Sequence, residues 1–358
     1  MARALTVVGG EVRRFGGATT ARAARRSWDE RHGWLLVLRD REGRGGLGEA
    51  SPLPGFSPED EGACERALRG FLELVPLSLE LSADPVEWLG AAATIASPAA
   101  RMAVETALLD LAGQVLGRSV AELLGGRPPA AAVPLAALVD GSDGEELVAA
   151  VAAWCATGIA TFKVKGGRRR AFEEELGALT ALRRSASDVA LRLDVNGGWT
   201  PREARRNLER LAPLGLEFVE QPVAAEALLD FGPAPVPVAA DESVQLPGAL
   251  SRLVATGSCR VMVLKPMALG GLMHCLELAR EASEAGLGVV ISHLFDGPVA
   301  LAAACELALA LPVAPLACGL APHAGLAAWP GVVVPQIHGG FVSPSGRAGL
   351  GLEPEAFR

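Results

Sequence analysis

Apolar and polar positions in the middle of the chain form short apolar runs that each end in a charged side chain. Five such runs follow one another, with 21 to 29 residues between successive charged ends. They are Thr161-Phe-Lys163-Val-Lys165, Leu191-Arg-Leu-Asp194, Phe218-Val-Glu220, Val238-Ala-Ala-Asp241 and Val261-Met-Val-Leu-Lys265. A βαβ unit takes roughly 30 residues, so the spacing indicates strands that alternate with helices. A parallel barrel would bring all five strand ends onto one rim.

The pattern before these runs is different. Residues 1–50 are rich in strand-like segments, and residues 59–126 have helical periodicity. Within the latter, Ser97 and Pro98 are a typical N-cap and first residue of a helix that ends at Gly117. We therefore expect an α+β unit at the N-terminus.

From Ala132 onward strands and helices alternate, and many strands are continuous apolar runs, as in parallel sheets that are covered on both faces. Strands are expected to start at Val133, Thr161, Ala190, Glu217, Val236, Arg260, Gly288 and Val313. The prediction is an α/β fold: a modified (β/α)7–8 TIM-type barrel at residues 131–329, with an N-terminal α+β capping domain at residues 1–130. The Gly/Pro-rich segment 330–358 is expected to pack back on the capping domain.

Composition narrows the function classes. The chain is 50% hydrophobic with net charge −8, and no basic tract is long enough to follow a phosphate backbone, so nucleic acid is not expected as a partner. The N-terminus is too weakly apolar for a signal peptide, and the apolar stretch Val299–Ala317 contains Glu306 and two prolines, which favours a buried helix over a membrane span. Six scattered cysteines indicate a reducing, cytoplasmic location. The sequence is compatible with a homo-oligomer.

Three of the charged strand ends are carboxylates. Asp194, Glu220 and Asp241 would end three successive strands. Hard oxygen ligands of this kind suit Mg²⁺ or Mn²⁺ and leave coordination positions for a substrate. Any one of them could instead cap the helix that follows. Three in successive units, with lysines on both sides, favour a metal site.

The lysines are the second part of the predicted site. Lys163 and Lys165 lie two apart on one strand, so both point into the barrel, and each is expected to lower the pKa of the other. A lysine with a lowered pKa is a usable base. Lys265 ends the opposite strand. Salt bridges to the carboxylates are the simpler alternative. A Schiff-base aldolase needs one lysine and no metal triad, so it ranks lower.

The order Lys-x-Lys, Asp, Glu, Asp, Lys on successive strands resembles the muconate-lactonizing subgroup of the enolase superfamily. The surrounding stretches are similar as well, and the resemblance covers nearly the whole chain. They are Phe162-Lys-Val-Lys165, Leu193-Asp-Val-Asn-Gly-Gly-Trp199, Val219-Glu-Gln-Pro222, Ala240-Asp-Glu-Ser243, Leu264-Lys-Pro266, Thr106-Ala-Leu-Leu-Asp-Leu-Ala-Gly113 and Gly339-Gly-Phe-Val-Ser-Pro-Ser-Gly-Arg-Ala-Gly-Leu-Gly-Leu352.

The resemblance implies a division of labour. A divalent metal, usually Mg²⁺, would bind the carboxylate of a small substrate and stabilise an enediolate. Lys165 would remove the α-proton, Lys163 would support it, and Lys265 would face the opposite side of the enediolate. Asn196 and Glu242 would lie next to the metal ligands Asp194, Glu220 and Asp241. The capping domain would help to choose the substrate.

The loop Gly48-Glu-Ala-Ser-Pro-Leu-Pro-Gly-Phe-Ser57 resembles that of o-succinylbenzoate synthases, and Arg192 fits that group too. The implied reaction is loss of water from 2-succinyl-6-hydroxy-2,4-cyclohexadiene-1-carboxylate, which gives 2-succinylbenzoate in menaquinone biosynthesis. Lys165 would take the α-proton and then protonate the leaving hydroxyl. Residues expected to contact the substrate are Leu53, Phe56, Arg192, Ser292, His293 and Gly319.

Several alternatives stay open at this stage. An N-acylamino acid racemase would use two opposed lysines as bases, and a muconate cycloisomerase belongs to the same subgroup. A dipeptide epimerase fits less well, because Leu316-Ala-Cys-Gly-Leu320 lacks an Asp-x-Asp signature. His293 would be a base in the mandelate racemase subgroup, but Lys265 stands where its Asp partner is expected. A non-catalytic barrel with a structural metal would be expected to lack one of the charged residues at the rim. All six of these rim residues are present, namely Lys163, Lys165, Asp194, Glu220, Asp241 and Lys265.

Overall fold

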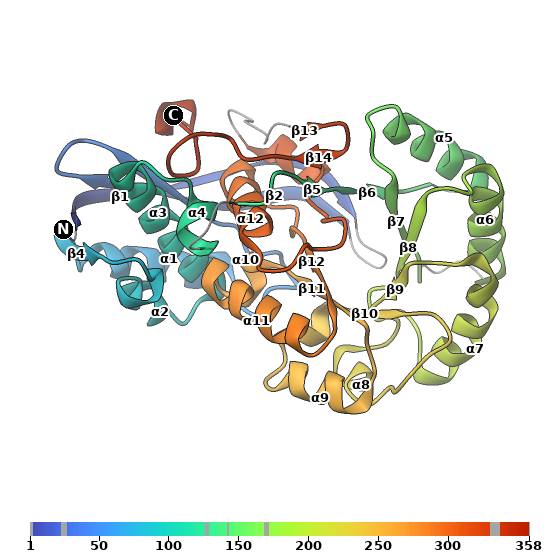
Figure 1. The fold of residues 1–358 in the computed structure, drawn as a ribbon. Helices are drawn as coiled ribbons and strands as arrows, with labels where there is room; N and C mark the ends of the chain where they lie inside the picture. Colours follow the sequence, from blue (N-terminus) through green and yellow to red (C-terminus); the bar gives the residue numbers. More distant parts are fainter. Residues whose placement is uncertain are drawn as a thin grey trace.

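The capping domain is built on an antiparallel sheet. The computed structural model describes residues 3–22, 27–125, 129–141, 143–167, 172–329 and 337–357. Four strands lie in the order β3-β2-β1-β4, and each pair is antiparallel (Figure 1). Their bounds are β1 Arg3–Arg22, β2 Ser27–Asp40, β3 Gly45–Ala50 and β4 Leu77–Leu81.

Strand β4 corrects the expectation that residues 59–126 are helical throughout. Leu77-Ser-Leu-Glu-Leu81 alternates with period two, and it pairs with β1 in an antiparallel register from Arg3↔Leu81 to Val7↔Leu77. Alternation over five residues indicates a strand, but the segment is short and lies inside a longer region with helical periodicity.

Helix α3 (Pro98–Leu116) is the core of the capping domain. Ser97 caps it as expected, accepting from the Ala100 amide, and Gly117 ends it in the left-handed region at φ 68°. Fourteen of its residues are buried, because β3 lies directly against it. A Cβ on Gly48 would stand 1.9 Å from the carbonyl oxygen of Ala103, so only glycine permits this approach. The remaining capping helices are α1 Glu61–Leu72, α2 Gly90–Ala93 and α4 Val120–Gly125.

The second unit is a curled parallel sheet of seven strands. Their order β12-β11-β10-β9-β8-β7-β6 follows the chain, and every neighbouring pair is parallel. In Figure 1 helices α5, α6 and α7 run along the outer side of this sheet. The strands are β6 Ala136–Val139, β7 Thr161–Lys165, β8 Ala190–Asp194, β9 Phe218–Glu220, β10 Val238–Ala240, β11 Val261–Leu264 and β12 Gly288–Ile291.

The barrel helices follow the predicted alternation. Helix α12 contains most of the apolar stretch that begins at Val299, and every residue of this helix is buried, in agreement with its interpretation as a buried helix. No helix among the described residues is long and apolar enough to cross a membrane. The helices are α5 Gly144–Cys155, α6 Phe172–Ser185, α7 Pro201–Leu211, α8 Ala225–Leu228, α9 Ala249–Thr256, α10 Pro266–Leu269, α11 Leu272–Glu284 and α12 Pro298–Ala310.

The expected eighth strand at Val313 is not formed. Instead, the segment Leu316–Gly319 joins the two edges of the sheet through single bridges, Ser292↔Gly319 on one side and Leu135↔Cys318 on the other. Pro312 and Pro315 lack the amide hydrogens that a regular ladder needs. The seven-strand outcome lies within the predicted range of seven to eight.

The C-terminal segment contacts both units. Strands β13 (Ile337–His338) and β14 (Phe341–Val342) form a hairpin that pairs with β5 (Val133–Pro134) at the start of the barrel. Further on, the Leu350 amide donates to Asp110 of α3 at 2.9 Å. The described part of this segment therefore contacts α3 of the capping domain and also pairs with the barrel. Residues 330–336 of the predicted tail lie outside the described residues, and the division of the chain at residue 130 stays a prediction.

Candidate active site

The ends of β7 and β8 bring the first lysine and carboxylate together. These strands pair in register, with Lys165 opposite Asp194. The Nζ atom of Lys165 donates to Oδ2 of Asp194 at 2.6 Å and to Oδ1 of Asn196 at 3.0 Å. Asn196 is held in the left-handed region at φ 46°, which turns its side chain back toward the lysine. Lys165 is therefore oriented by two oxygen acceptors on the neighbouring strand end.

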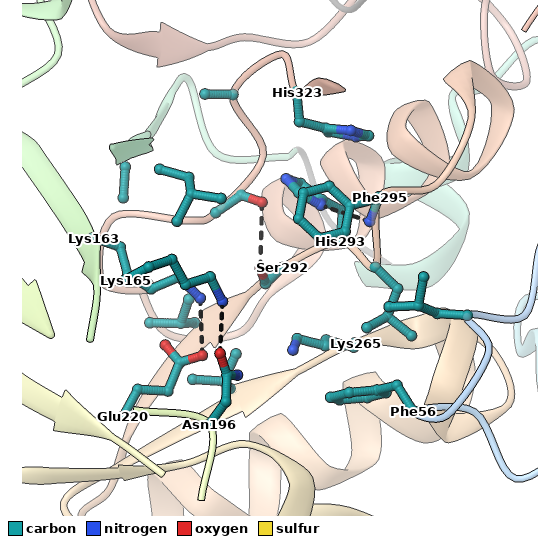
Figure 2. A pocket seen from close by; sticks show the side chains of 18 of the residues that line it. Phe56, Lys163, Lys165, Asn196, Glu220, Lys265, Ser292, His293, Phe295 and His323 are labelled. Atoms are coloured by element: carbon teal, nitrogen blue, oxygen red, sulfur yellow. Dashed lines mark hydrogen bonds and ion pairs between the residues drawn. The ribbon is translucent and has the colours of Figure 1, made fainter. Parts of the chain in front are cut away.

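The other two lysines each meet a carboxylate as well. Lys163 lies 2.9 Å from Oε1 of Glu220 and 3.1 Å from Oδ2 of Asp194. Lys265 lies 2.5 Å from Oδ2 of Asp241. Figure 2 shows Lys163 and Lys165 side by side, directed at Glu220 and Asn196, with Lys265 on the other side of the pocket. The structure thus gathers the six predicted rim residues at one end of the barrel.

The charges of this cluster are strongly coupled. Burial opposes the charge of Lys163, but Asp194 and Glu220 outweigh it and raise the pKa of Lys163 above its ordinary value. The pKa of Lys265 is also raised, because Asp241 outweighs the effect of burial. The expectation of a lowered pKa is therefore wrong for Lys163 in this structure. The sequence pattern showed the neighbouring amine but not how closely the carboxylates approach it.

The pKa values of the three carboxylates shift in different directions, because burial and the neighbouring charges act on each of them to a different extent. Burial, with the charge of Asp194, raises the pKa of Glu220 to about 7. Burial raises the pKa of Asp241 to about 6 despite Lys265. Burial also disfavours the charge of Asp194, but Lys163 and Lys165 outweigh it and lower that pKa.

These carboxylates fit a divalent cation by their chemistry. All three are buried oxygen donors on adjacent strand ends, and a cation between them would relieve their mutual repulsion. Among the described residues, no three Asp, Glu, His or Cys side chains lie close enough together to enclose a metal. Their oxygens are turned toward the lysine ammonium groups instead. The lysines contact Oδ2 of Asp194 and of Asp241 and Oε1 of Glu220, which leaves the second oxygen of each carboxylate to bind a dication.

Residues next to the carboxylates hold them in place. Nδ2 of Asn196 is 3.4 Å from Oε1 of Glu242, whose pKa is raised by burial. Gln221 accepts from the Asp241 amide at 3.0 Å and donates to Oγ of Ser243 at 2.7 Å. In the sequence, Gln221 is distinguished only as part of the stretch Val219-Glu-Gln-Pro222, which resembles the family. Its role as a support for Asp241 depends on the packing of β9 against β10.

A pocket opens above the cluster, and all six predicted substrate contacts line it (Figure 2). Further lining residues that the sequence analysis did not single out include Trp28, Phe295, Ala321, Pro322 and His323. They come from the second strand and from loops without a periodic pattern, so the sequence carried no signal for them.

Arg192 occupies the interior of the barrel below the pocket. Its Nε donates to Oε2 of Glu217 at 2.6 Å and its Nη1 to the Ala317 carbonyl at 2.6 Å. The guanidinium also lies 4.6 Å from the centre of the Phe218 ring. Its Nη2 is buried and has no hydrogen-bond partner within the described parts of the chain. Arg192 on β8 therefore contacts the start of β9 and the segment Leu316–Gly319.

The loop Gly48–Ser57, called the capping loop from here on, covers the side of the pocket that holds Lys265. The ring of Phe56 lies 4.4 Å from Nζ of Lys265, a cation–π contact. Leu53 is buried, and Nε1 of Trp28 donates to the Pro54 carbonyl at 3.3 Å. The loop that carries the resemblance to o-succinylbenzoate synthases therefore touches one of the rim residues directly.

Arg31 fastens this capping loop to the barrel. From β2 its guanidinium donates to the carbonyls of Ser51 and Pro52 at 2.7 and 2.9 Å. It also donates to the carbonyls of Leu294 and Phe295 at 3.2 and 3.1 Å. Sequence reasoning missed Arg31, because a single arginine in a strand carries no pattern.

His293 does not form the dyad of the mandelate racemase subgroup. Its Nδ1 accepts from the Phe295 amide at 3.0 Å, while Asp296 accepts from the Leu294 amide at 3.1 Å. Lys265 follows the preceding strand, as the sequence indicated. His293 and Asp296 therefore each bind a backbone amide and do not form a histidine–aspartate pair.

The family models agree with this architecture. Residues 13–125 match the N-terminal domain of mandelate racemase and muconate lactonizing enzymes, and residues 146–357 match the enolase C-terminal domain-like model. The chain belongs to the mandelate racemase/muconate lactonizing family of the enolase superfamily, and it is an enzyme of that superfamily.

Relatives within the family carry different activities. The chain is 31% identical over 300 residues to the chloromuconate cycloisomerase of Cupriavidus pinatubonensis, covering 80% of each chain. It is 38% identical over 193 residues to the o-succinylbenzoate synthase of Thermobifida fusca, covering 53% of this chain and 59% of the relative. The dipeptide epimerase of Methylococcus capsulatus, solved with Mg and a dipeptide, superposes with a TM-score of 0.83 at 28% identity, covering 97% of this chain and 99% of that structure.

Proposed function

We propose that the protein removes the α-proton of a small carboxylate and is an o-succinylbenzoate synthase. The observation that carries the first part is the placement of lysines on both sides of three buried carboxylates at the barrel mouth. An α-proton next to a carboxylate is weakly acidic, so its removal needs a positioned base and positive charge near the developing anion.

In this proposal Lys165 is the base. Asp194 and Asn196 hold its Nζ from the side of β8, which leaves the opposite side for the substrate. Lys165 takes the proton from C1 of 2-succinyl-6-hydroxy-2,4-cyclohexadiene-1-carboxylate and returns it to the hydroxyl that leaves C6. One water is lost, and the ring becomes aromatic. Lys163, held by Glu220, supports Lys165 and the carboxylate, and Lys265 faces the other side of the enediolate.

Asp194, Glu220 and Asp241 would hold a divalent metal, with Asn196 and Glu242 beside them. Such an ion supplies positive charge next to the substrate carboxylate when it is bound. Mg²⁺, with Mn²⁺ as an alternative, suits three carboxylate ligands, and the Methylococcus relative was solved with Mg.

The lining of the pocket favours an anionic substrate. With Lys165 neutral as the base, the cationic side chains that line it are Lys163, Lys265 and Arg192. Of the described residues that line the pocket, Glu220 is the one carboxylate, and it faces Lys163. The capping loop around Phe56 and the likeness to the Thermobifida synthase support the succinyl-bearing substrate.

N-acylamino acid racemase is the second candidate. Lys165 and Lys265 stand on opposite sides of the pocket, as a two-base racemisation requires. A cycloisomerase that acts on a muconate-type dicarboxylate is the third candidate, because one relative is a chloromuconate cycloisomerase. A dipeptide epimerase is favoured least, since the pocket lining offers no separate carboxylate for a free ammonium group among the residues described.

A direct comparison of substrates tests this choice. The Mg²⁺-loaded protein should dehydrate the cyclohexadiene substrate faster than it racemises N-succinylamino acids or cyclises muconate, as followed by absorbance and by chiral analysis. Racemisation or cyclisation as the fastest reaction would refute the synthase assignment while leaving Lys165 as the proposed base.

A further inference from the structure

Two histidines stack against each other at the mouth of the pocket. His293 follows β12, and His323 lies in the loop after the bridging segment Leu316–Gly319. Their ring centres are 3.7 Å apart, with 32° between the planes. Phe295 packs against both rings, at 5.5 Å from His293 and 5.9 Å from His323 (Figure 2). The pair forms the wall of the pocket across from the rim carboxylates.

Burial disfavours the charged form of both imidazoles. Burial, with the charges of the nearby lysines, lowers the pKa of His293 well below its ordinary value. Burial, with Arg31, lowers the pKa of His323 to about 3. A neutral imidazole has one donor and one acceptor nitrogen. Because Nδ1 of His293 accepts from the Phe295 amide, the proton of His293 lies on Nε2.

His323 has an unsatisfied hydrogen-bonding capacity. Both of its ring nitrogens are buried, and neither has a partner among the residues that the structure describes. A buried polar group without a partner is destabilising, so such groups are rare unless a ligand or water completes them. His323 lines the same pocket as Lys165 and Lys265. A substrate in this pocket can therefore supply the missing partner.

We propose that His293 and His323 form a neutral polar subsite that binds the distal carboxylate of the substrate's acyl arm. The inference rests on the proposed function, since it takes the rim to bind the other carboxylate of the same molecule. Nε2 of His293 donates one hydrogen bond and the protonated ring nitrogen of His323 a second. An ammonium group at this end is disfavoured, because no described carboxylate lines this wall and Nδ1 of His293 already accepts from the Phe295 amide.

The test compares ligands that differ only at the distal end. The Mg²⁺-loaded protein and its His323→Phe variant are titrated calorimetrically with 2-succinylbenzoate and with 2-butyrylbenzoate, which has a methyl group in place of the distal carboxylate. Phe keeps an aromatic ring in the stack but removes both nitrogens. Because the variant loses one hydrogen bond to a charged group, its affinity for 2-succinylbenzoate should fall by about tenfold. Binding of 2-butyrylbenzoate should change by less than about twofold.

A matched control and a second ligand pair keep the result decisive. His338→Phe alters an exposed histidine outside this pocket and should change neither affinity. If the benzoates do not bind, N-succinyl- and N-butyrylamino acids provide the same comparison through their α-proton exchange in D₂O. Equal losses for the succinyl and butyryl ligands, or no preference for succinyl in either pair, would overturn the subsite. Failure of the synthase reaction alone, with the succinyl preference intact, would refute only the proposed function.

Discussion

At the scale of single residues, the site is defined by side chains that the strand ends hold in fixed directions. Lys165, Asp194 and Glu220 were predictable, because the period of a strand decides which way they point and the length of a βαβ unit decides where each strand ends. Trp28 and His323 were not predictable, because they reach the pocket from other parts of the fold. Lys163 was predicted with the wrong pKa direction, since the approach of two carboxylates depends on side-chain packing.

Arg31 provides a prediction at this scale. Replacing it with Gln leaves several of the four buried carbonyls without donors, which should lower the free energy of unfolding by about 3 kcal/mol. The KM of the substrate should rise as well, because the capping loop loses its attachment to the barrel. Urea denaturation and steady-state kinetics measure both quantities. Arg14→Gln, which removes an exposed ion pair with Glu61, should cost less than about 1 kcal/mol. Equally small effects in both variants would contradict the role of Arg31.

At the scale of elements, carboxylates of one unit cap helices of the other. Glu49 on β3 accepts from the amides of Gly297 and Ala300 at the start of α12, at 2.5 and 2.9 Å. Glu105 on α3 accepts from the Met273 amide of α11 at 2.9 Å. Neither helix has a capping side chain of its own. The capping domain and the barrel thus complete each other, which the sequence could not show because the partners are far apart along the chain.

Glu49 gives stability a defined dependence on pH. Burial, with the charge of Asp296, raises the pKa of Glu49 to about 8 from an ordinary 4.5. The folded protein therefore binds this proton more tightly than the unfolded chain, so unfolding becomes easier as pH rises from about 4.5 to 8. Glu49→Gln keeps a neutral side chain throughout and should show a shallower decline across this range. Thermal unfolding at pH 5 and pH 8 measures it. An identical decline in both proteins would show that Glu49 does not hold its proton.

At the scale of the whole molecule, the barrel mouth is completed by three distant parts of the chain. The capping loop, the strand ends and the bridging segment Leu316–Gly319 all line one pocket. The alternation of strands and helices predicted this barrel, whereas its closure without an eighth strand was not predicted. Pro312 and Pro315 were visible in the sequence, but single bridges in place of a ladder form only when both edges of the sheet are in position.

Metal binding should stabilise the whole molecule. An ion that binds only the folded state adds about 2.7 kcal/mol at one hundred times its Kd, so Mg²⁺ should raise the Tm and EDTA should reverse the rise. Asp241→Asn removes a proposed ligand and should reduce the shift. Asp230→Asn, at an exposed ion pair with Arg252, should keep it. Differential scanning calorimetry with and without Mg²⁺ distinguishes the two. A full shift in Asp241→Asn would place the metal elsewhere.

The central claim is that Lys165 removes the α-proton, and the most direct measurement is the rate at which Lys165→Ala aromatises the cyclohexadiene substrate. The variant is compared with the unaltered protein at saturating Mg²⁺, after circular dichroism has shown that both are folded. Loss of the general base should lower kcat by at least about a hundredfold. A folded Lys165→Ala variant that retains kcat within tenfold of the unaltered protein would contradict the account.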